Sequence, residues 1–267
     1  MKQLKLMVLT LTLLMGTMFT SCMDSGESGP QQWAGVVKVN DRMGYVTFTD
    51  AAGTELVPTN TIPVTLNARM AYIYCQVDEG QDLSTNPKSI KITLLADPTG
   101  IDATAITTPK VGESGDVTTN APVGSLGFAS GYSTVAPFQF SENTIVLPVL
   151  YRVKNVTTTE DIKNELAKHT FTLVCYTDDI KSGDTILKLY LRYKVEDEPA
   201  AIAERATRTS SFKAYESSQI LREYTLKSGQ AKPAKITIVA KQKEYNNKLE
   251  DTSTTEKVYE IEYKTAE

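Results

Sequence analysis

Leu187 to Val195 read LKLYLRYKV, the most regular pattern in the chain. Apolar side chains stand at every second position, and Lys188, Arg192 and Lys194 fall between them. Successive side chains of a β-strand point to opposite faces, so a period of two predicts a strand with one face in a core. The other face of this strand meets water, which is typical of antiparallel sheets.

Two stretches that precede it carry the same alternation. Ile145 to Val153 and Phe171 to Cys175 each place apolar residues at every second position. Pro148 lacks the backbone N–H that a ladder needs, which predicts that its strand lies at a sheet edge or holds a bulge there.

The segment Thr159 to Lys168 (TEDIKNELAK) lies between these two strands. It has acidic residues early and lysine late, and Ile162 and Leu166 stand four residues apart, as in a short amphipathic helix. We expect a crossover helix that covers one end of a sheet. Pro199 to Arg205 predicts one further helical turn.

The C-terminal part continues the strand pattern. Ile236 to Ala240 and Tyr259 to Tyr263 alternate on either side of the polar stretch Asn246 to Glu256, which predicts a hairpin with a long mobile tip. The turn Ser182-Gly183-Asp184 predicts a hairpin before the strand that begins at 187. Together these patterns favour a β-sandwich over residues 106–267.

The part before it has a different texture. Trp33 to about Pro98 holds four short alternating stretches separated by glycine-containing turns. About five strands in this length are typical of a small Greek-key barrel of the OB type. We place this domain at residues 33–105. Asp97 to Pro137 then holds six of the fifteen glycines and four of the eleven prolines, which predicts a linker with irregular loops. The expected fold class is therefore all-β, with two domains.

Residues 1–21 have the features of a signal peptide, because a positively charged start precedes an apolar run too short to span a bilayer. Residues 19–22 read Phe-Thr-Ser-Cys and resemble a bacterial lipobox, in which an acylated cysteine becomes the mature N-terminus. Phe19 stands where leucine is usual. We expect lipidation of Cys22 and a polar tether over residues 22–32. The alternative is an ordinary secretory signal followed by an incidental cysteine.

These features together resemble one family. The lipobox with its tether, the barrel-like first part, and the segments HTFTLVCY (His169–Tyr176) and LKLYLRY (Leu187–Tyr193) resemble the NigD-like lipoproteins of Bacteroides-type bacteria. The resemblance implies an OB-like N-terminal domain, an immunoglobulin-like C-terminal sandwich and lipidation at the outer membrane. It also implies an accessory or immunity role at a bacteriocin locus, and it brings no catalytic residues.

Few residues of the chain are suited to catalysis. His169 is the only histidine, so a multi-histidine zinc site is excluded, and no Cys-x-x-Cys, His-Glu-x-x-His or Gly-x-Ser-x-Gly run occurs. His169 stands between a predicted helix and a predicted strand, where we expect a helix C-terminal cation or a strand-edge hydrogen bonder rather than the base of a triad. We expect no catalytic residue, no cofactor and no metal.

Cysteine and tryptophan are expected in the cores. Cys75 and Cys175 lie on the apolar faces of strands in different predicted domains, and we expect free buried thiols, although export would permit a disulfide between them. Trp33 is expected to fill the bottom of the first domain, and an exposed sugar-stacking platform is the alternative.

Three acidic clusters fall at predicted strand ends or in turns. Solvated carboxylates are ordinary in such places, whereas a calcium site or a glycosidase pair are the functional alternatives. The clusters are Asp78-Glu79, Asp178-Asp179 and Glu196-Asp197-Glu198.

Charge bears on the choice of partner. The chain has 28 Lys+Arg against 32 Asp+Glu, and residues 31–100 hold five basic against seven acidic side chains, which argues against nucleic-acid binding by the barrel.

The leading hypothesis is a non-enzymatic, lipid-anchored envelope protein that binds another protein. A carbohydrate-binding accessory lipoprotein is the alternative, and an enzyme comes third. Coplanar exposed aromatic rings would favour a glycan, and a cleft with two facing carboxylates would favour an enzyme.

Overall fold

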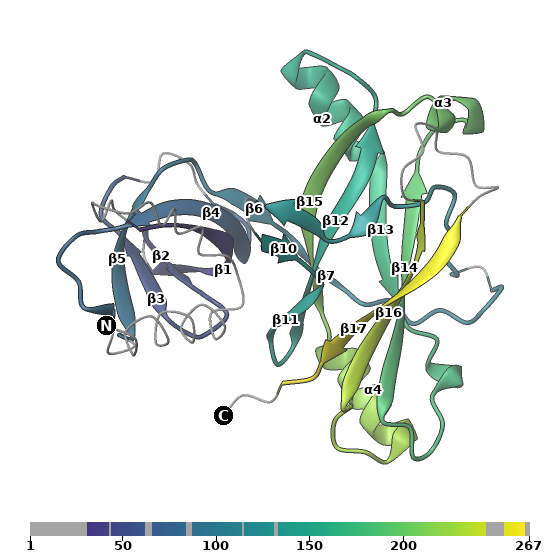
Figure 1. Ribbon diagram of the computed structural model, residues 1–267. Coiled ribbons are helices and arrows are strands. Elements are labelled where there is room, and N and C mark those ends of the chain that lie inside the picture. Colours follow the sequence, from purple (N-terminus) through teal and green to yellow (C-terminus); the bar gives the residue numbers. More distant parts are fainter. Residues whose placement is uncertain are drawn as a thin grey trace. The chain divides into compact units, whose positions relative to one another are not determined.

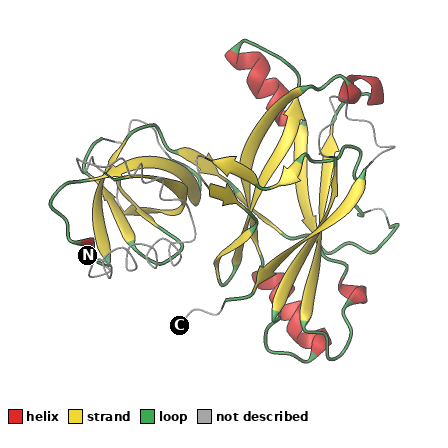
Figure 2. Cartoon of the chain, viewed as in Figure 1, coloured by secondary structure: helices red, strands yellow, loops and turns green. Residues whose placement is uncertain are grey.

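The computed structural model describes residues 31–42, 44–61, 66–83, 87–113, 115–130, 133–243 and 254–264. Of the residues that the structure describes, 49% are in strands and 14% in helices, so this part of the chain is mostly β (Figures 1 and 2). Two compact units are present: one holds the described residues up to Ala103 together with Ala129–Val135, and the other holds Thr104–Phe128 and Ala136–Glu267. The predicted signal peptide and Cys22 lie outside the described residues. That the two parts fold independently, with a boundary near residue 105, stays a prediction.

A five-stranded barrel makes up most of the first unit. It consists of β1 (Gln32–Arg42), β2 (Tyr45–Thr49), β3 (Glu55–Pro58), β4 (Met70–Val77) and β5 (Ser89–Leu94). The strand order is β1-β2-β3-β5-β4, and an antiparallel β1–β4 pairing closes the ring, while β3 and β5 run parallel. Closure leaves no long unpaired edge in the barrel. A short strand β6 (Thr99–Ile101) adds to β4.

Trp33 lies in the barrel core and is only 6% exposed, so its predicted place in the core is confirmed and the sugar-platform alternative is wrong. Gly35 lies two positions along the same strand, on the same face. A Cβ atom on Gly35 would stand 2.6 Å from Cζ2 of the Trp33 ring. Only glycine therefore lets the indole lie flat against this strand.

Two sheets form the second unit. The first has the order β11 (Phe138–Ser141), β12 (Thr144–Val153), β15 (Thr207–Glu216) and β7 (Ala103–Ala105), and β8 (Ser125–Leu126) also pairs with β12. The second has the order β13 (His169–Val174), β14 (Ile186–Val195), β16 (Lys235–Gln242) and β17 (Thr255–Glu262). Leu147 and Tyr151 of the first sheet share one buried cluster with Leu173 and Leu189 of the second. The sheets thus bury their apolar faces against a common core, as a sandwich does.

The remaining elements are short. They are the two-stranded ladder of β9 (Phe128–Ser130) and β10 (Ser133–Val135), the helices α2 (Thr159–Ala167), α3 (Pro199–Ala203) and α4 (Ser218–Ser228), and the 3-10 turn η2 (Thr177–Asp179). None of the helices in the described part of the chain is long and apolar enough to cross a membrane.

Several sequence expectations about this unit need correction. The predicted strands and both predicted helices are present, but β14 and β16 pair in parallel, so the second sheet is mixed. Pro148 lies inside the first sheet, at the point where β12 has finished pairing with β11 and has not begun pairing with β8. Neither β11 nor β8 pairs with Pro148, so its missing N–H breaks no ladder hydrogen bond on that side. The pairing of β16 with β17 is antiparallel as predicted, while most of the predicted mobile tip lies outside the described residues.

The glycine- and proline-rich segment is not the linker that its composition predicts. Ala121 and Val123 are buried in the core of the second unit. The side chain of Asn120 donates to the carbonyl of Val195 at 2.9 Å and accepts the Val195 N–H at 2.8 Å. This segment therefore provides hydrogen-bond partners for the backbone at the end of β14, which extends beyond its pairing with β16.

Candidate functional site

The outer face of the second sheet is the side that points away from the shared core. Along β14 it carries Ile186, Lys188, Tyr190 and Arg192, which alternate with the buried leucines and Tyr193. In register with Tyr190 stand three valines, one on each of the other strands. They are Val174, Val239 and Val258. Ile186 is 48% exposed and Val258 is 55% exposed, so this face presents apolar side chains to solvent between charged ones.

A cluster of tyrosines and cations occupies one end of this face. The rings of Tyr176 and Tyr190 meet edge to face, with centroids 5.2 Å apart and an interplanar angle of 62°. The guanidinium of Arg192 lies 5.1 Å from the Tyr190 centroid and 5.6 Å from that of Tyr176. Arg192 also donates to the Tyr176 hydroxyl at 2.8 Å, and that hydroxyl donates to Asp116 at 2.8 Å. These contacts fix the two rings in place.

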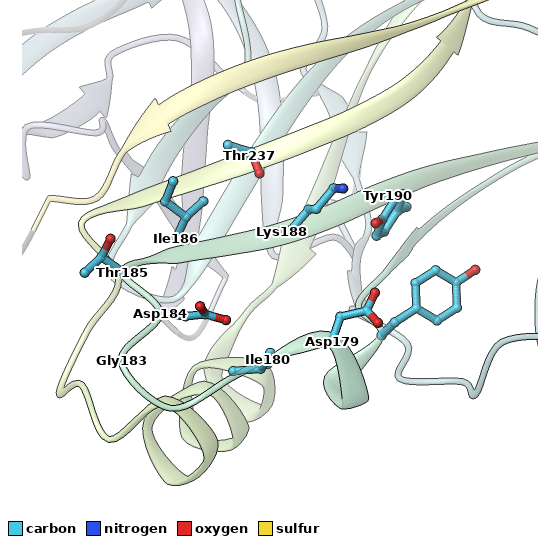
Figure 3. A pocket seen from close by; sticks show the side chains of 10 residues that line it. Asp179, Ile180, Gly183, Asp184, Thr185, Ile186, Lys188, Tyr190 and Thr237 are labelled. Atoms are coloured by element: carbon cyan, nitrogen blue, oxygen red, sulfur yellow. The ribbon is translucent and has the colours of Figure 1, made fainter.

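A pocket of about 490 Å³ opens beside these rings, between the segment that joins β13 to β14 and the start of β14 (Figure 3). Gly183 adopts φ = 87° in this segment, which confirms the turn expected there. The lining combines aromatic, aliphatic, acidic and hydroxyl groups from Tyr176, Asp179, Ile180, Gly183, Asp184, Thr185, Ile186, Lys188, Tyr190 and Thr237.

A second group of polar residues is buried at the other end of β14, where α2 meets β13. We name Glu165, His169, Asp197 and Arg205 the buried ionic cluster. Arg205 is fully buried, and its Nε donates to Glu165 Oε1 at 2.7 Å while Nη2 donates to Oε2 at 3.2 Å. Glu165 also accepts the backbone N–H of Lys154 at 2.9 Å. Burial alone would raise the pKa of Glu165, but these hydrogen bonds outweigh it and lower the pKa.

Asp197 completes the cluster. Its carboxylate lies 3.2 Å from Lys168, 3.2 Å from Arg205 and 3.3 Å from Lys154. The hydrogen bond from Lys168 and then that from Arg205 hold its pKa well below the usual range. Its side chain is 19% exposed and is paired with three cations, so the turn carboxylate expected here is present but is not surrounded by solvent alone.

The two sides of α2 are the reverse of what its pattern predicts. Glu165 is the buried residue of the helix, whereas Ile162 and Leu166 are each 42% exposed. The helix is held to the unit by ionic hydrogen bonds from Arg205 and not by an apolar stripe. The sequence offers no local signal for this, because Arg205 follows Glu165 only after forty residues.

His169 is the first residue of β13 and both of its ring nitrogens are occupied. Nδ1 lies 2.6 Å from the Tyr193 hydroxyl, and Nε2 lies 3.2 Å from Glu165. A neutral ring satisfies both contacts, with Nε2–H donating to Glu165 and Nδ1 accepting from Tyr193. Burial lowers the pKa of His169 and outweighs the opposing effect of Glu165. The expected hydrogen bonder is therefore present, but the expected helix C-terminal cation is wrong.

The lowered pKa of His169 predicts acid sensitivity of the second unit. The unfolded chain takes up a proton near pH 6.5, and the folded unit does so only at lower pH, so stability is lost as pH falls through this window. One such site changes the free energy of unfolding by at most about 1.4 kcal/mol per pH unit. Tyr151, Arg205 and Lys213 also face the ring, and the two cations disfavour its protonation further.

Hydrogen exchange in β13 and β14, measured at pH 7 and pH 5, checks this expectation. The wild-type protein should lose protection at the lower pH, and His169→Gln, which cannot titrate, should lose less. An equal loss in both proteins would show that His169 is not the group responsible.

Other predicted site residues have structural roles. Cys75 and Cys175 are free and buried, and burial raises the pKa of each thiol to about 12, so both are poor nucleophiles. Asp178 forms an ion pair with Lys227 at 3.1 Å, and Asp78 accepts from Thr93 at 2.8 Å. Over the described ranges, no three His, Cys, Asp or Glu residues converge as a metal site would need.

No family model matches the chain, and no curated protein matches it. A Bacteroides vulgatus protein of unknown function, DUF1344, has a TM-score of 0.55 at 12% identity, over 88% of this chain and 92% of that one. The fold of this chain is thus similar to that of the Bacteroides vulgatus protein.

A crystal structure from Bacteroides fragilis gives the family. The protein named "Putative lipoprotein (BF3042)" is 93% identical, with a TM-score of 0.81, over 89% of this chain and 100% of that one. The chain belongs to the same family as this protein. A NigD-like immunity protein of Bacteroides caccae also matches, at 12% identity and a TM-score of 0.47, over 87% of this chain and 93% of that one. None of these proteins is named as an enzyme.

Proposed function

We propose that this chain is a lipid-anchored protein of the outer membrane that acts by binding another protein and has no catalytic activity of its own. The lipobox at Cys22 and the 93% identity to a protein named as a lipoprotein support the anchor. An accessory or immunity role at a bacteriocin locus, which the NigD-like resemblance implies, would be one form of such binding.

The finer fold assignments belong to the same proposal. The closed order β1-β2-β3-β5-β4, with β3 parallel to β5, supports an OB-type barrel. Two sheets around one core support an immunoglobulin-like sandwich. The parallel β14–β16 pair departs from the antiparallel sheets of that fold.

The observation that carries the binding proposal is the outer face of the second sheet. Tyrosine and arginine are enriched where proteins bind each other, and apolar side chains surrounded by charges are typical of such surfaces. Ile186 and Val258 are about half exposed on this face, beside Tyr190 and Arg192. The rings of Tyr176 and Tyr190 are inclined by 62°, whereas a sugar platform needs rings that a pyranose can lie across. This geometry favours a polypeptide over a glycan.

Comparative co-purification tests the proposal. Tagged full-length protein is extracted from Bacteroides membranes as wild type, as Tyr190→Ala with Ile186→Asp, and as Tyr45→Ala. Tyr45 is 57% exposed on the barrel and serves as the matched control. We expect one polypeptide that is retained by the wild type and the control and falls at least about tenfold with the double variant, the loss of about 1.4 kcal/mol or more that interface anchors give. Equal recovery with all three proteins, or recovery of glycan alone, would overturn the proposal.

A further inference from the structure

The pocket beside Tyr190 carries more negative than positive charge. Its lining includes two carboxylates, Asp179 and Asp184, and one ammonium group, Lys188. Figure 3 shows both carboxylates in the space between the connecting segment and β14. Lys188 lies 5.1 Å from the Tyr190 centroid and, within the described part of the chain, forms no ion pair with either carboxylate.

The two carboxylates have unused capacity to accept hydrogen bonds. Among the residues that the structure describes, the Asp179 carboxylate makes no hydrogen bond and no ion pair, and that of Asp184 accepts only the backbone N–H of Lys181, at 2.7 Å. An ionised carboxylate has about four lone-pair sites, so most of them are available to a ligand. Asp178 contrasts with them, because its charge is already paired with Lys227.

The other walls of the pocket suit a long side chain with a cationic tip. Ile180 and Ile186 provide aliphatic surface on which methylene groups can pack. Tyr176 and Tyr190 also line the pocket, and their rings already contact cations of this chain: Arg192 lies 5.6 Å and 5.1 Å from the two centroids, and Lys188 lies 5.1 Å from that of Tyr190.

We infer that this pocket receives an arginine side chain of the partner polypeptide, with its guanidinium group between Asp179 and Asp184 and its stem against Ile180 and Ile186. Guanidinium is preferred to ammonium because its planar fork can donate to two carboxylates at once and stack on a ring. The inference rests on the proposed function and specifies the residue on the partner that the outer face recognises.

Ligand-observed saturation-transfer NMR with the full chain tests the inference. The probe is the capped peptide Ac-Gly-Gly-Arg-Gly-Gly-NH2, and its control is the same peptide with citrulline, an uncharged residue of nearly the same shape. We expect saturable binding of the arginine peptide, at least about tenfold tighter than the citrulline peptide, since the charge-assisted hydrogen bonds are absent from the control. Equal affinity of the two peptides, or no saturation by either, would contradict the inference.

Variants locate the effect. Asp179→Asn with Asp184→Asn should abolish the preference for arginine over citrulline, while Asp178→Asn should preserve it, because Asp178 does not line the pocket. Unchanged hydrogen exchange in β13 and β14 verifies that the variants are folded. A preference that survives in the double variant would place arginine binding elsewhere.

The outcome also separates this inference from the proposed function. If Tyr190→Ala with Ile186→Asp loses the co-purified polypeptide and the double asparagine variant keeps it, the outer face binds a protein but not through arginine. If neither variant changes recovery of the polypeptide, the proposed function itself is wrong.

Discussion

Replacing Arg205 by leucine should lower the free energy of unfolding of the second unit by about 3–5 kcal/mol, the range observed when one partner of a buried ion pair is removed. Arg205 is fully buried and donates to both oxygens of Glu165. Without it, the Glu165 carboxylate stays buried with only the Lys154 N–H and His169 as partners. Asp197 also loses one of its three cations.

Chemical denaturation, monitored by hydrogen exchange in β13 and β14, measures this loss in the free energy of unfolding. Trp33 is the only tryptophan, so its fluorescence reports on the barrel. The denaturation curve measured by this fluorescence should be the same in the variant and the wild type. Arg222→Leu is the matched control, because Arg222 lies exposed on α4, where substitutions usually change stability by less than about 0.5 kcal/mol.

A second variant separates charge burial from packing. Glu165→Leu combined with Arg205→Leu removes both members of the ion pair. This double variant should lower the free energy of unfolding by less than the sum of the two single changes. If Arg205→Leu lowers the free energy of unfolding no more than Arg222→Leu does, the buried ionic cluster does not hold α2 and α3 in place.

Replacing Cys22 by serine should release nearly all of the protein from the membrane fraction. Each buried methylene of an acyl chain contributes about 0.8 kcal/mol, so several chains on one cysteine give strong anchoring, and serine cannot be acylated in this way. The folded units should be unaffected. Unchanged hydrogen exchange in the barrel and in the second unit would verify this.

Ultracentrifugation and labelling with palmitate together measure the release. Ser21→Ala is the matched control: it keeps a small residue before Cys22 and should leave the protein lipidated. If Cys22→Ser sediments with membranes and takes up as much label as the control, the cysteine is not the anchor.

Strands could be predicted from the sequence wherever one face is buried, because the period of two appears directly in the residues. This holds for β13 and β14, and β12 could be predicted from its apolar residues although both of its faces are buried. It fails for β15, whose residues TRTSSFKAYE show no regular alternation and whose side chains are mostly half-buried or exposed. It also fails for α4, although Gly229 at φ = 75° closes that helix and Ile220 and Tyr224 stand four apart.

The candidate site was only partly predictable. Lys188, Tyr190 and Arg192 could be placed on the wet face of a strand, since they alternate with leucines. That Tyr176 and Asp179 would come to lie beside them depends on the path of the β13–β14 connection, which periodicity does not report. The buried ionic cluster escaped prediction because a buried glutamate looks like a surface residue until its partner is known.

Site-specific photo-crosslinking in living Bacteroides cells tests the central claim, that the outer face binds a polypeptide, most directly. A photoactivatable phenylalanine analogue replaces Ile186 in one strain and Tyr45 in another, two positions of similar exposure. Irradiation should give a discrete adduct from position 186 that protease digests and glycosidases leave intact, and no such adduct from position 45. No adduct from position 186, or the same adduct from both positions, would contradict the claim.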